Sequence, residues 1–208
     1  MSPGESKELY PVIWVYVHTP GADPALVAKM KKMLLAAADG AVAQTGERRG
    51  YAAGIRGYWW GSNRLIGSTG ANCILAAELT DEPAARQRYL AAAEEYVHYL
   101  HGRNPVGLCY LTNMKAFGAE RSVMVMFHSW LGNPSKQREP YGGQFVGEGP
   151  GKIGPPPGFI VGGANGGMRR YVDSLNTGLK PWEFNEPCLS YQSPCAILLG
   201  YFGLRADR

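Results

Sequence analysis

Two carboxylic acids and a tryptophan lie close together near the end of the chain. The stretch from Tyr171 to Ser193, YVDSLNTGLKPWEFNEPCLSYQS, places Asp173, Trp182 and Glu186 just before a final apolar segment. Cleavage of a glycosidic bond needs a carboxyl group that holds and delivers a proton, beside a flat surface on which a sugar ring can lie. The stretch contains both kinds of side chain, so the remaining elements are considered for how they would position it.

The composition is that of an ordinary globular domain. Of the 208 residues, 45% are hydrophobic and 18% are charged, which is enough for one sizeable core, so a single domain over residues 1–208 is expected. The net charge of +4 comes from Lys and Arg spread along the chain. The one tight basic cluster, KMKK from Lys29 to Lys32, falls on a helical pattern and is interpreted as a solvated face. Nucleic acid is therefore not expected as a partner.

The beginning of the chain lacks the marks of export or membrane insertion. The apolar run from Val12 to Val17 follows no basic region and is too short for a signal sequence or a membrane span. As it stands, the chain is expected to be soluble, not exported and without a membrane as partner. A chain whose true beginning is missing would look the same, so its localisation is left open.

The four cysteines are expected to be free thiols. Cys73, Cys109, Cys188 and Cys195 form no Cys-x-x-Cys pair, so neither a zinc site nor a redox motif is predicted. Cys188 and Cys195 are seven residues apart, which is roughly 10 Å along a helix and too far for a disulfide. No metal and no cofactor are predicted.

Helical spacing of apolar residues dominates the chain outside its middle part. Asp23 is expected to cap the first helix at its start. Helices are predicted over four ranges: 24–40, 64–79, 84–100 and 187–204. The last is apolar almost all round, with Pro194 either kinking it or marking a second start. The short apolar run 11–18 is instead expected to be an extended or buried piece.

The segment from Gly102 to Pro181 changes character. It holds most of the glycines and prolines, including GEGPGKIGPPPG over 147–158, and has only short apolar runs. A structureless stretch of this length inside a compact domain is unusual unless it carries function. The sequence therefore predicts long Gly/Pro-rich active-site loops laid over a helical scaffold.

Exposed aromatic rings are the expected sugar-binding surface. Trp59 and Trp60 follow Tyr58 and precede the small polar pair Ser62-Asn63 in a predicted loop. Trp130 and Trp182 are further candidates for stacking on sugar rings. For any one of these tryptophans, a place in the hydrophobic core is the competing interpretation.

Four segments along the chain form a recognisable set: YWWGSN over 58–63, YLHGRNPVGLCYLT over 99–112, PGFIVGGAN over 157–165, and the stretch 171–193. They resemble, in the same order, the C-terminal part of family 9 glycoside hydrolases, the cellulase family. The resemblance implies a mainly α fold, namely an (α/α)6 barrel. This chain is too short for the whole helical toroid, so an incomplete barrel is expected, with the chain as its C-terminal half.

The family's C-terminal signature fits seven positions of the stretch 171–193: Tyr171, Asp173, Trp182, Glu186, Cys188, Gln192 and Ser193. Asp173 and Trp182 are four residues further apart than usual. Cys188 replaces a Ser, Thr or Ala, and Gln192 replaces an Asn. The resemblance implies that Glu186 is the general acid of an inverting mechanism, with Asp173 as a second carboxylate that orients or perturbs it and Tyr171 as a substrate contact.

The local sequence sets up a conflict at Glu186. A helix beginning at Pro187 would stabilise the ionised carboxylate through its dipole, whereas a general acid has to stay protonated. Desolvation by Trp182 and Phe184, or the negative charge of Asp173, would have to outweigh the dipole. Otherwise Glu186 is an ordinary N-terminal cap.

Two parts of the family's machinery have no clear counterpart. The aspartates that activate the water belong to an upstream motif that this sequence does not contain. In the place of the sugar-gripping His-His-Arg run stands Met126-Phe127-His128-Ser129, so His128 is a candidate substrate contact while Ser129 replaces the Arg. Arg121 or Arg138 could substitute for that Arg.

The first hypothesis is a glycoside hydrolase acting on β-1,4-glucan or a related polysaccharide or oligosaccharide, with Glu186 as proton donor. The second is a non-catalytic carbohydrate-binding or scaffold remnant that kept the sugar cleft and lost the base. A third is a fragment without an independent role. Half a toroid exposes the apolar flanks of its helices, so such a fragment is expected to self-associate or to need the missing N-terminal half.

Overall fold

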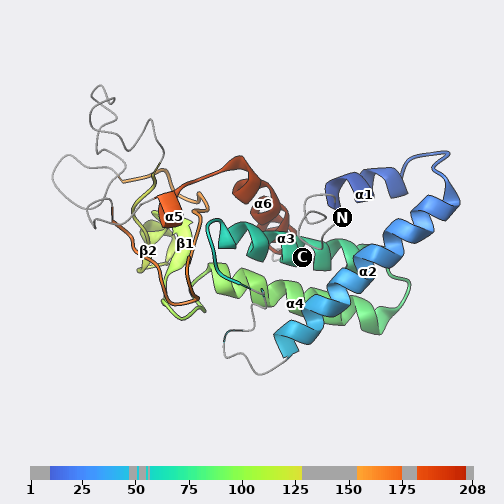
Figure 1. Ribbon diagram of the computed structural model, residues 1–208, viewed down its shortest axis with the longest axis horizontal. Helices are drawn as coiled ribbons and strands as arrows, with labels where there is room; N and C mark the ends of the chain where they lie inside the picture. Colours follow the sequence, from blue (N-terminus) through green and yellow to red (C-terminus); the bar gives the residue numbers. More distant parts are fainter. Residues whose placement is uncertain are drawn as a thin grey trace. The chain divides into compact units, whose positions relative to one another are not determined.

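The computed structural model describes residues 10–46, 51, 55, 57–127, 154–174 and 182–204. Helices dominate these ranges, as predicted (Figure 1). The helices are α1 (Tyr10–Val17), α2 (Pro24–Gly46), α3 (Ser62–Leu79), α4 (Pro83–Leu100), α5 (Trp182–Asn185) and α6 (Leu189–Gly203). The strands are β1 (Cys109–Thr112) and β2 (Ser122–Val123), with a 3-10 turn, η2 (Lys115–Phe117), between them. No helix within the described ranges is both long and apolar enough to cross a bilayer.

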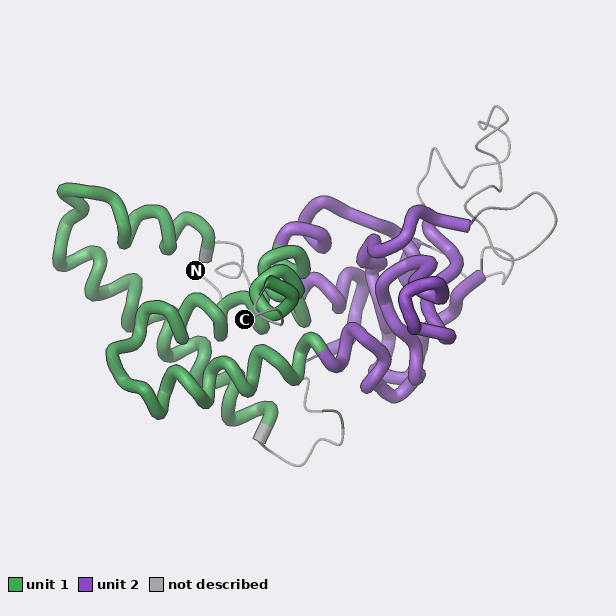
Figure 2. Tube along the Cα trace, turned by 180° about the vertical axis from the view of Figure 1, so that it is seen from behind, with its two compact units in different colours: residues 1–54, 65–97, 194–208 green, residues 55–64, 98–193 purple. Residues whose placement is uncertain are grey.

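The chain forms two compact units, shown in green and purple in Figure 2. Unit 1 comprises residues 1–54, 65–97 and 194–208, and unit 2 comprises residues 55–64 and 98–193. Unit 1 therefore contains most of the long helices. Unit 2 contains the two strands, α5 and all four segments that carry the family resemblance.

Unit 1 has a helical core built from regularly spaced small and apolar residues. On α2 the buried residues are Leu34, Ala38 and Ala41, which recur at the helical spacing that places them on one face. Most side chains of α3 in this unit are buried, in keeping with its Ala, Leu and Ile content. Gly67 and Gly70 of α3 have no side chain, which leaves room for Cys195 and Leu198 of α6 to approach closely.

The start of α2 agrees with the sequence, whereas α1 does not. The Asp23 Oδ1 accepts a hydrogen bond of 2.9 Å from the Ala25 backbone N–H, which is the predicted N-terminal cap. The helix continues to Gly46, beyond the predicted end at Gly40, because one glycine costs an alanine-rich helix only about 1 kcal/mol. The prediction that 11–18 is an extended or buried piece is wrong. Residues 11–17 lie in α1, with Val12 and Val15 exposed, since a short apolar run does not distinguish a strand from a helix.

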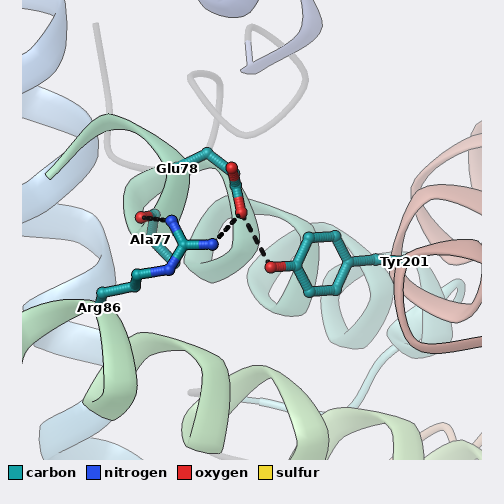
Figure 3. Close-up of polar contacts among 4 residues, drawn as sticks. All are labelled: Ala77, Glu78, Arg86 and Tyr201. Carbon is teal, nitrogen blue, oxygen red and sulfur yellow. Dashed lines mark hydrogen bonds and ion pairs between the residues drawn. The ribbon is translucent and has the colours of Figure 1, made fainter. Parts of the chain in front are cut away.

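A polar cluster joins three helices at the surface of unit 1 (Figure 3). The Arg86 guanidinium of α4 donates to the Ala77 carbonyl at 2.9 Å and to Glu78 Oε1 at 2.7 Å, at the end of α3. The Tyr201 hydroxyl of α6 donates to the same Glu78 oxygen at 2.8 Å. The cluster satisfies a helix-end carbonyl and ties α6 to α3, so it is a structural contact.

Unit 2 contains a small sheet that the sequence pattern did not predict. β1 and β2 are parallel, with Cys109 paired to Ser122 and Thr112 paired to Val123, and η2 lies in the connection. Leu111 also forms an antiparallel bridge with Ile160. All four β1 residues are buried, which matches a run of consecutive apolar residues rather than an alternating strand. The Gly/Pro-rich segment is thus partly ordered by strand pairing.

A column of aromatic rings runs through unit 2. Neighbouring ring centroids are 6.4 Å apart for Tyr58 and Tyr99, 5.9 Å for Tyr99 and Tyr110, and 5.2 Å for Tyr110 and Tyr171. Tyr171 continues it to Phe184 at 6.0 Å. The column connects residues from three of the four segments singled out in the sequence, and these segments therefore share one core.

Candidate active site

Glu186 lies in unit 2, in the chain between the end of α5 and the start of α6. It directly follows α5, and α6 begins three residues later at Leu189. The predicted helix start at Pro187 is wrong, because Pro187 instead forms an antiparallel bridge with Val161. Glu186 therefore lies outside the first turn of α6, and the α6 dipole does not act on it as expected, since a helix dipole acts mainly within its own first turn.

The Glu186 carboxyl group holds no other described part of the protein in place. Its side chain is half-buried, and it has no hydrogen-bond or ion-pair partner among the residues that the structure describes. The neighbouring acid differs: Glu183 Oε2 accepts a hydrogen bond from Asn165 at 3.3 Å and lies 4.0 Å from the Arg170 guanidinium. Glu186 is therefore free to meet a ligand.

Both carboxylate oxygens of Asp173 accept hydrogen bonds from the backbone of another segment. Its Oδ2 accepts the Met124 N–H at 2.8 Å and its Oδ1 accepts the Val125 N–H at 3.0 Å. Burial raises the pKa of the Asp173 carboxyl, and the two N–H donors partly offset that rise. The observed contacts of Asp173 hold the segment that follows β2.

Gln192, which stands at the Asn position of the signature, also binds backbone. Its Oε1 accepts the Ile160 N–H at 2.9 Å, and its Nε2 donates to the Ile160 carbonyl at 2.6 Å. An amide has an acceptor oxygen and a donor nitrogen, and Gln192 uses both on the backbone of one residue. The replacement of Asn by Gln in this sequence therefore retains a group that can bond to both the N–H and the C=O of Ile160.

The segment Val161 to Gly163 joins two of the predicted motifs. The Gly163 N–H donates to the Phe184 carbonyl at 2.9 Å, and the Gly162 carbonyl accepts the Asn63 N–H at 3.0 Å. The Asn63 side chain donates to the Val161 carbonyl at 3.0 Å. Gly163 has a φ of +88°, and a side chain there would collide with Asn63, which explains the second glycine of the Gly-Gly pair in PGFIVGGAN.

Three of the predicted sugar-stacking tryptophans are at the surface. Trp59 is 50% exposed, Trp60 is 49% exposed and Trp182 is 41% exposed. The Trp60 indole N–H donates to the Trp182 carbonyl at 3.0 Å, so these two residues are neighbours. The Phe127 ring lies 6.1 Å from that of Trp182. The structure therefore brings aromatic surface next to α5, the helix that Glu186 directly follows.

Tyr171 is half-buried, and its hydroxyl is bonded to protein. That hydroxyl donates a hydrogen bond of 2.6 Å to Asn185 Oδ1, so its partner in the structure is protein. Asn185 is the residue that the sequence interpretation missed. It is fully buried, and the only available signal was an amide placed directly before Glu186 within an aromatic run.

Several predicted site residues lie outside the described residues, namely His128, Trp130 and Arg138. Arg121 is described, and its guanidinium donates to the Val106 carbonyl at 3.2 Å. None of the four cysteines, all of which lie in described ranges, is in a disulfide, as expected. Within the described ranges, no group of three His, Cys, Asp or Glu side chains gathers as metal ligands.

Comparison with known proteins places the chain in a family. The sequence profile of Glycosyl hydrolase family 9 matches residues 21–199. Endoglucanase D of Acetivibrio thermocellus is 25% identical over 184 residues, which is 88% of this chain and 25% of that protein. The chain therefore belongs to glycosyl hydrolase family 9. It spans about a quarter of the length of the curated relatives it matches.

Solved structures agree on the fold. A zinc-binding triple mutant of the GH family 9 endoglucanase J30 superposes with a TM-score of 0.70 at 25% identity, covering 91% of this chain and 33% of that one. AaCel9A in complex with cellobiose-like isofagomine superposes with a TM-score of 0.66 at 24% identity, covering 91% and 34%. The family 9 neighbours have an (α/α)6 barrel, so the predicted fold class, part of such a helical toroid, is confirmed.

Proposed function

We propose that this chain carries the proton-donating part of a glycoside hydrolase site for β-1,4-glucan or a related polysaccharide. Glu186 is the general acid that protonates the departing glycosidic oxygen in an inverting mechanism. Membership of family 9 and the endoglucanase names of its relatives support the reaction class. The carboxylate that activates the water belongs to a motif that this sequence does not contain.

One observation carries the assignment of Glu186. The side chains of Asp173, Gln192 and Tyr171 are each bonded to another part of unit 2, whereas the half-buried Glu186 has no hydrogen-bond or ion-pair partner among the described residues. A proton donor has to reach the substrate oxygen, so the group must be both held at its backbone and free at its carboxyl. Glu186 combines these two properties.

The aromatic surface beside α5 supports a sugar as the ligand. Trp60 and Trp182 are about half-exposed and adjacent, and Trp59 precedes them in the chain. Indole rings present a flat apolar face with a polar edge, which suits the face of a sugar ring. We assign these three residues to substrate binding. His128 and Trp130 stay predicted contacts. The Tyr171 hydroxyl is bonded to Asn185, so we assign Tyr171 to the support of the site in place of the predicted substrate contact. Asp173 acts on the site through the segment it holds.

The test compares two neighbouring glutamates. Glu186→Gln is expected to lower release of reducing ends from soluble carboxymethyl-cellulose by about 100-fold or more, because general acid catalysis contributes on the order of 10²–10⁴ in rate. Its free energy of unfolding should change by less than about 0.5 kcal/mol, since the carboxyl has no partner to lose. Glu183→Gln is the matched control and should keep its activity. Equal turnover in wild type and Glu186→Gln would remove the acid assignment.

One measurement separates the non-catalytic remnant hypothesis from the proposed hydrolase. A non-catalytic carbohydrate-binding remnant would quench the fluorescence of Trp60 and Trp182 on addition of cellopentaose without releasing any product. A hydrolase releases shorter sugars under the same conditions. Binding without product from the purified wild-type chain would favour the remnant over the proposed hydrolase.

A further inference from the structure

Asn185, the residue directly before Glu186, is bonded through its side chain and its backbone. Its Oδ1 accepts the Tyr171 hydroxyl at 2.6 Å, and its Nδ2 donates to the Val172 carbonyl at 2.9 Å. Its own carbonyl accepts the Phe127 N–H at 2.9 Å. The side chain is completely buried. Three hydrogen bonds therefore fix this residue to two segments that are distant in sequence.

The other neighbours of Glu186 are also fixed at the backbone. Two residues before Glu186, the Phe184 carbonyl accepts the Gly163 N–H at 2.9 Å. Directly after Glu186, Pro187 forms an antiparallel bridge with Val161. A helix of one turn such as α5 has little stability of its own. Its conformation is therefore set by these contacts, which leave the Glu186 carboxyl as the part of the segment that can move.

Tyr171 is suited to hold Asn185 rigidly. Its ring meets the rings of Tyr110 and Phe184 edge-on, at interplanar angles of 74° and 79°. A tyrosine has only two side-chain torsions, and packing on both sides fixes them. Burial raises the pKa of the Tyr171 phenol well above its usual range, with the charge of Asp173 adding to the rise. The hydroxyl thus stays protonated and donates to Asn185.

We propose that Tyr171 and Asn185 are positioning residues for the Glu186 proton donor. The Tyr171 hydroxyl orients the Asn185 amide, and the amide in turn fixes the backbone from which the Glu186 side chain reaches the substrate. This inference rests on the proposed role of Glu186. Proton transfer requires donor and acceptor within hydrogen-bond reach, and a misplacement of about 1 Å can cost on the order of 100-fold in rate.

The first test removes a single oxygen atom, in Tyr171→Phe. The matched control is Tyr89→Phe, which deletes another buried tyrosine hydroxyl, bonded to Asp39 Oδ1 at 2.8 Å in unit 1. Both variants should show a lowered melting temperature. Only Tyr171→Phe should reduce kcat on cellotetraose, by about 10-fold, with KM unchanged.

The choice of leaving group separates positioning from a general loss of structure. A 2,4-dinitrophenolate leaves without a proton, so it makes little demand on the general acid. Tyr171→Phe should therefore come within about twofold of wild type on 2,4-dinitrophenyl β-cellobioside while staying slow on cellotetraose. An equal loss on both substrates, or the same kcat loss in Tyr89→Phe, would overturn the proposal.

A readout without turnover keeps this inference separate from the proposed function. The side-chain carboxyl ¹³C resonance of Glu186 can be assigned by its absence from Glu186→Gln. It should shift in Tyr171→Phe and stay in place in Tyr89→Phe. If wild type releases no sugar, the proposed function fails and this resonance alone decides the positioning. Should Tyr171→Phe not fold, Asn185→Asp keeps the acceptor for Tyr171 and replaces only the donor to Val172. An unmoved Glu186 resonance in the variant that folds refutes the positioning role.

Discussion

The two units use their polar side chains in different ways. In unit 1, buried or half-buried tyrosine hydroxyls bond to carboxylates of other helices, as Tyr89 does with Asp39 and Tyr201 with Glu78. In unit 2, side-chain amides, hydroxyls and a carboxylate bond mainly to backbone. Examples are Asn63, Thr112, Asp173 and Gln192.

The difference follows from how each unit satisfies its peptide groups. A helix pairs its own backbone N–H and C=O groups except at its ends, so its side chains are left to bond with each other. Loops and short strands leave many peptide groups without a regular partner, and buried ones have to be satisfied by side chains. A polar side chain without a partner is therefore informative in unit 2, and Glu186 is such a side chain.

The largest stability effect that tests this contrast is expected for glycines. Gly163→Ala in unit 2 and Gly21→Ala in unit 1 both force a side chain into a positive φ, of +88° and +79°. Gly21 has open space around it, so only the conformational cost of about 1 kcal/mol should appear. At Gly163 the new methyl group displaces Asn63, and the loss should be roughly 3 kcal/mol.

Urea unfolding of both glycine variants measures these losses. The excess loss at Gly163 over Gly21 is the contribution of the close backbone approach between the two motifs. Equal losses in the two variants would show that the Val161 to Gly163 segment tolerates repacking, and that side-chain bonds to backbone matter less in unit 2 than the contacts indicate.

A smaller effect is expected for Asp173→Asn. An amide has one acceptor oxygen where the carboxylate has two, so one of the N–H groups of Met124 and Val125 loses its partner. The free energy of unfolding should fall by about 2 kcal/mol. Because the folded state raises the pKa of Asp173, the stabilising contribution of its proton is complete below the ordinary Asp range and is lost as the pH rises through the folded pKa.

The stability lost in Asp173→Asn is also expected to depend on pH. The stability difference between wild type and Asp173→Asn should shrink as the pH rises through that window, because only wild type loses the contribution of the proton. Urea unfolding at a series of pH values checks it. A difference that grows with pH would mean that the two N–H donors outweigh burial at Asp173.

The smallest difference between the units is expected in how readily their cysteine thiols react with a labelling reagent. In unit 1, burial raises the pKa of Cys73 and of Cys195 to about 12, so both should resist iodoacetamide at pH 8. In unit 2, Cys188 is half-exposed, with its sulfur 3.1 Å from the Ser190 hydroxyl, and should label first. Mass spectrometry of tryptic peptides gives the order, and full labelling in guanidinium is the control. Faster labelling of Cys73 would show that the unit 1 core opens readily.

Much of the fold could be predicted from local patterns. The Asp23 cap, the body of α2 and the ranges of α3 and α4 follow from side-chain spacing and capping chemistry that act within a few residues. The strands β1 and β2 could not, because their pairing joins residues such as Cys109 and Ser122 across a connection with no pattern of its own. The start of α6 was misplaced because Pro187 also satisfies a bridge to Val161.

The sequence by itself determined the family and singled out Glu186 as the candidate acid, because the order of four motifs and the spacing around one carboxylate are properties of the chain alone. The tertiary structure decided what the surrounding residues do. Asp173 bonds to Met124 and Val125, and Asn185 bonds to Tyr171, through contacts that depend on distance in space. A carboxylate that holds backbone and one that is free have the same letter in a sequence, and only the peptide groups around them tell the two apart.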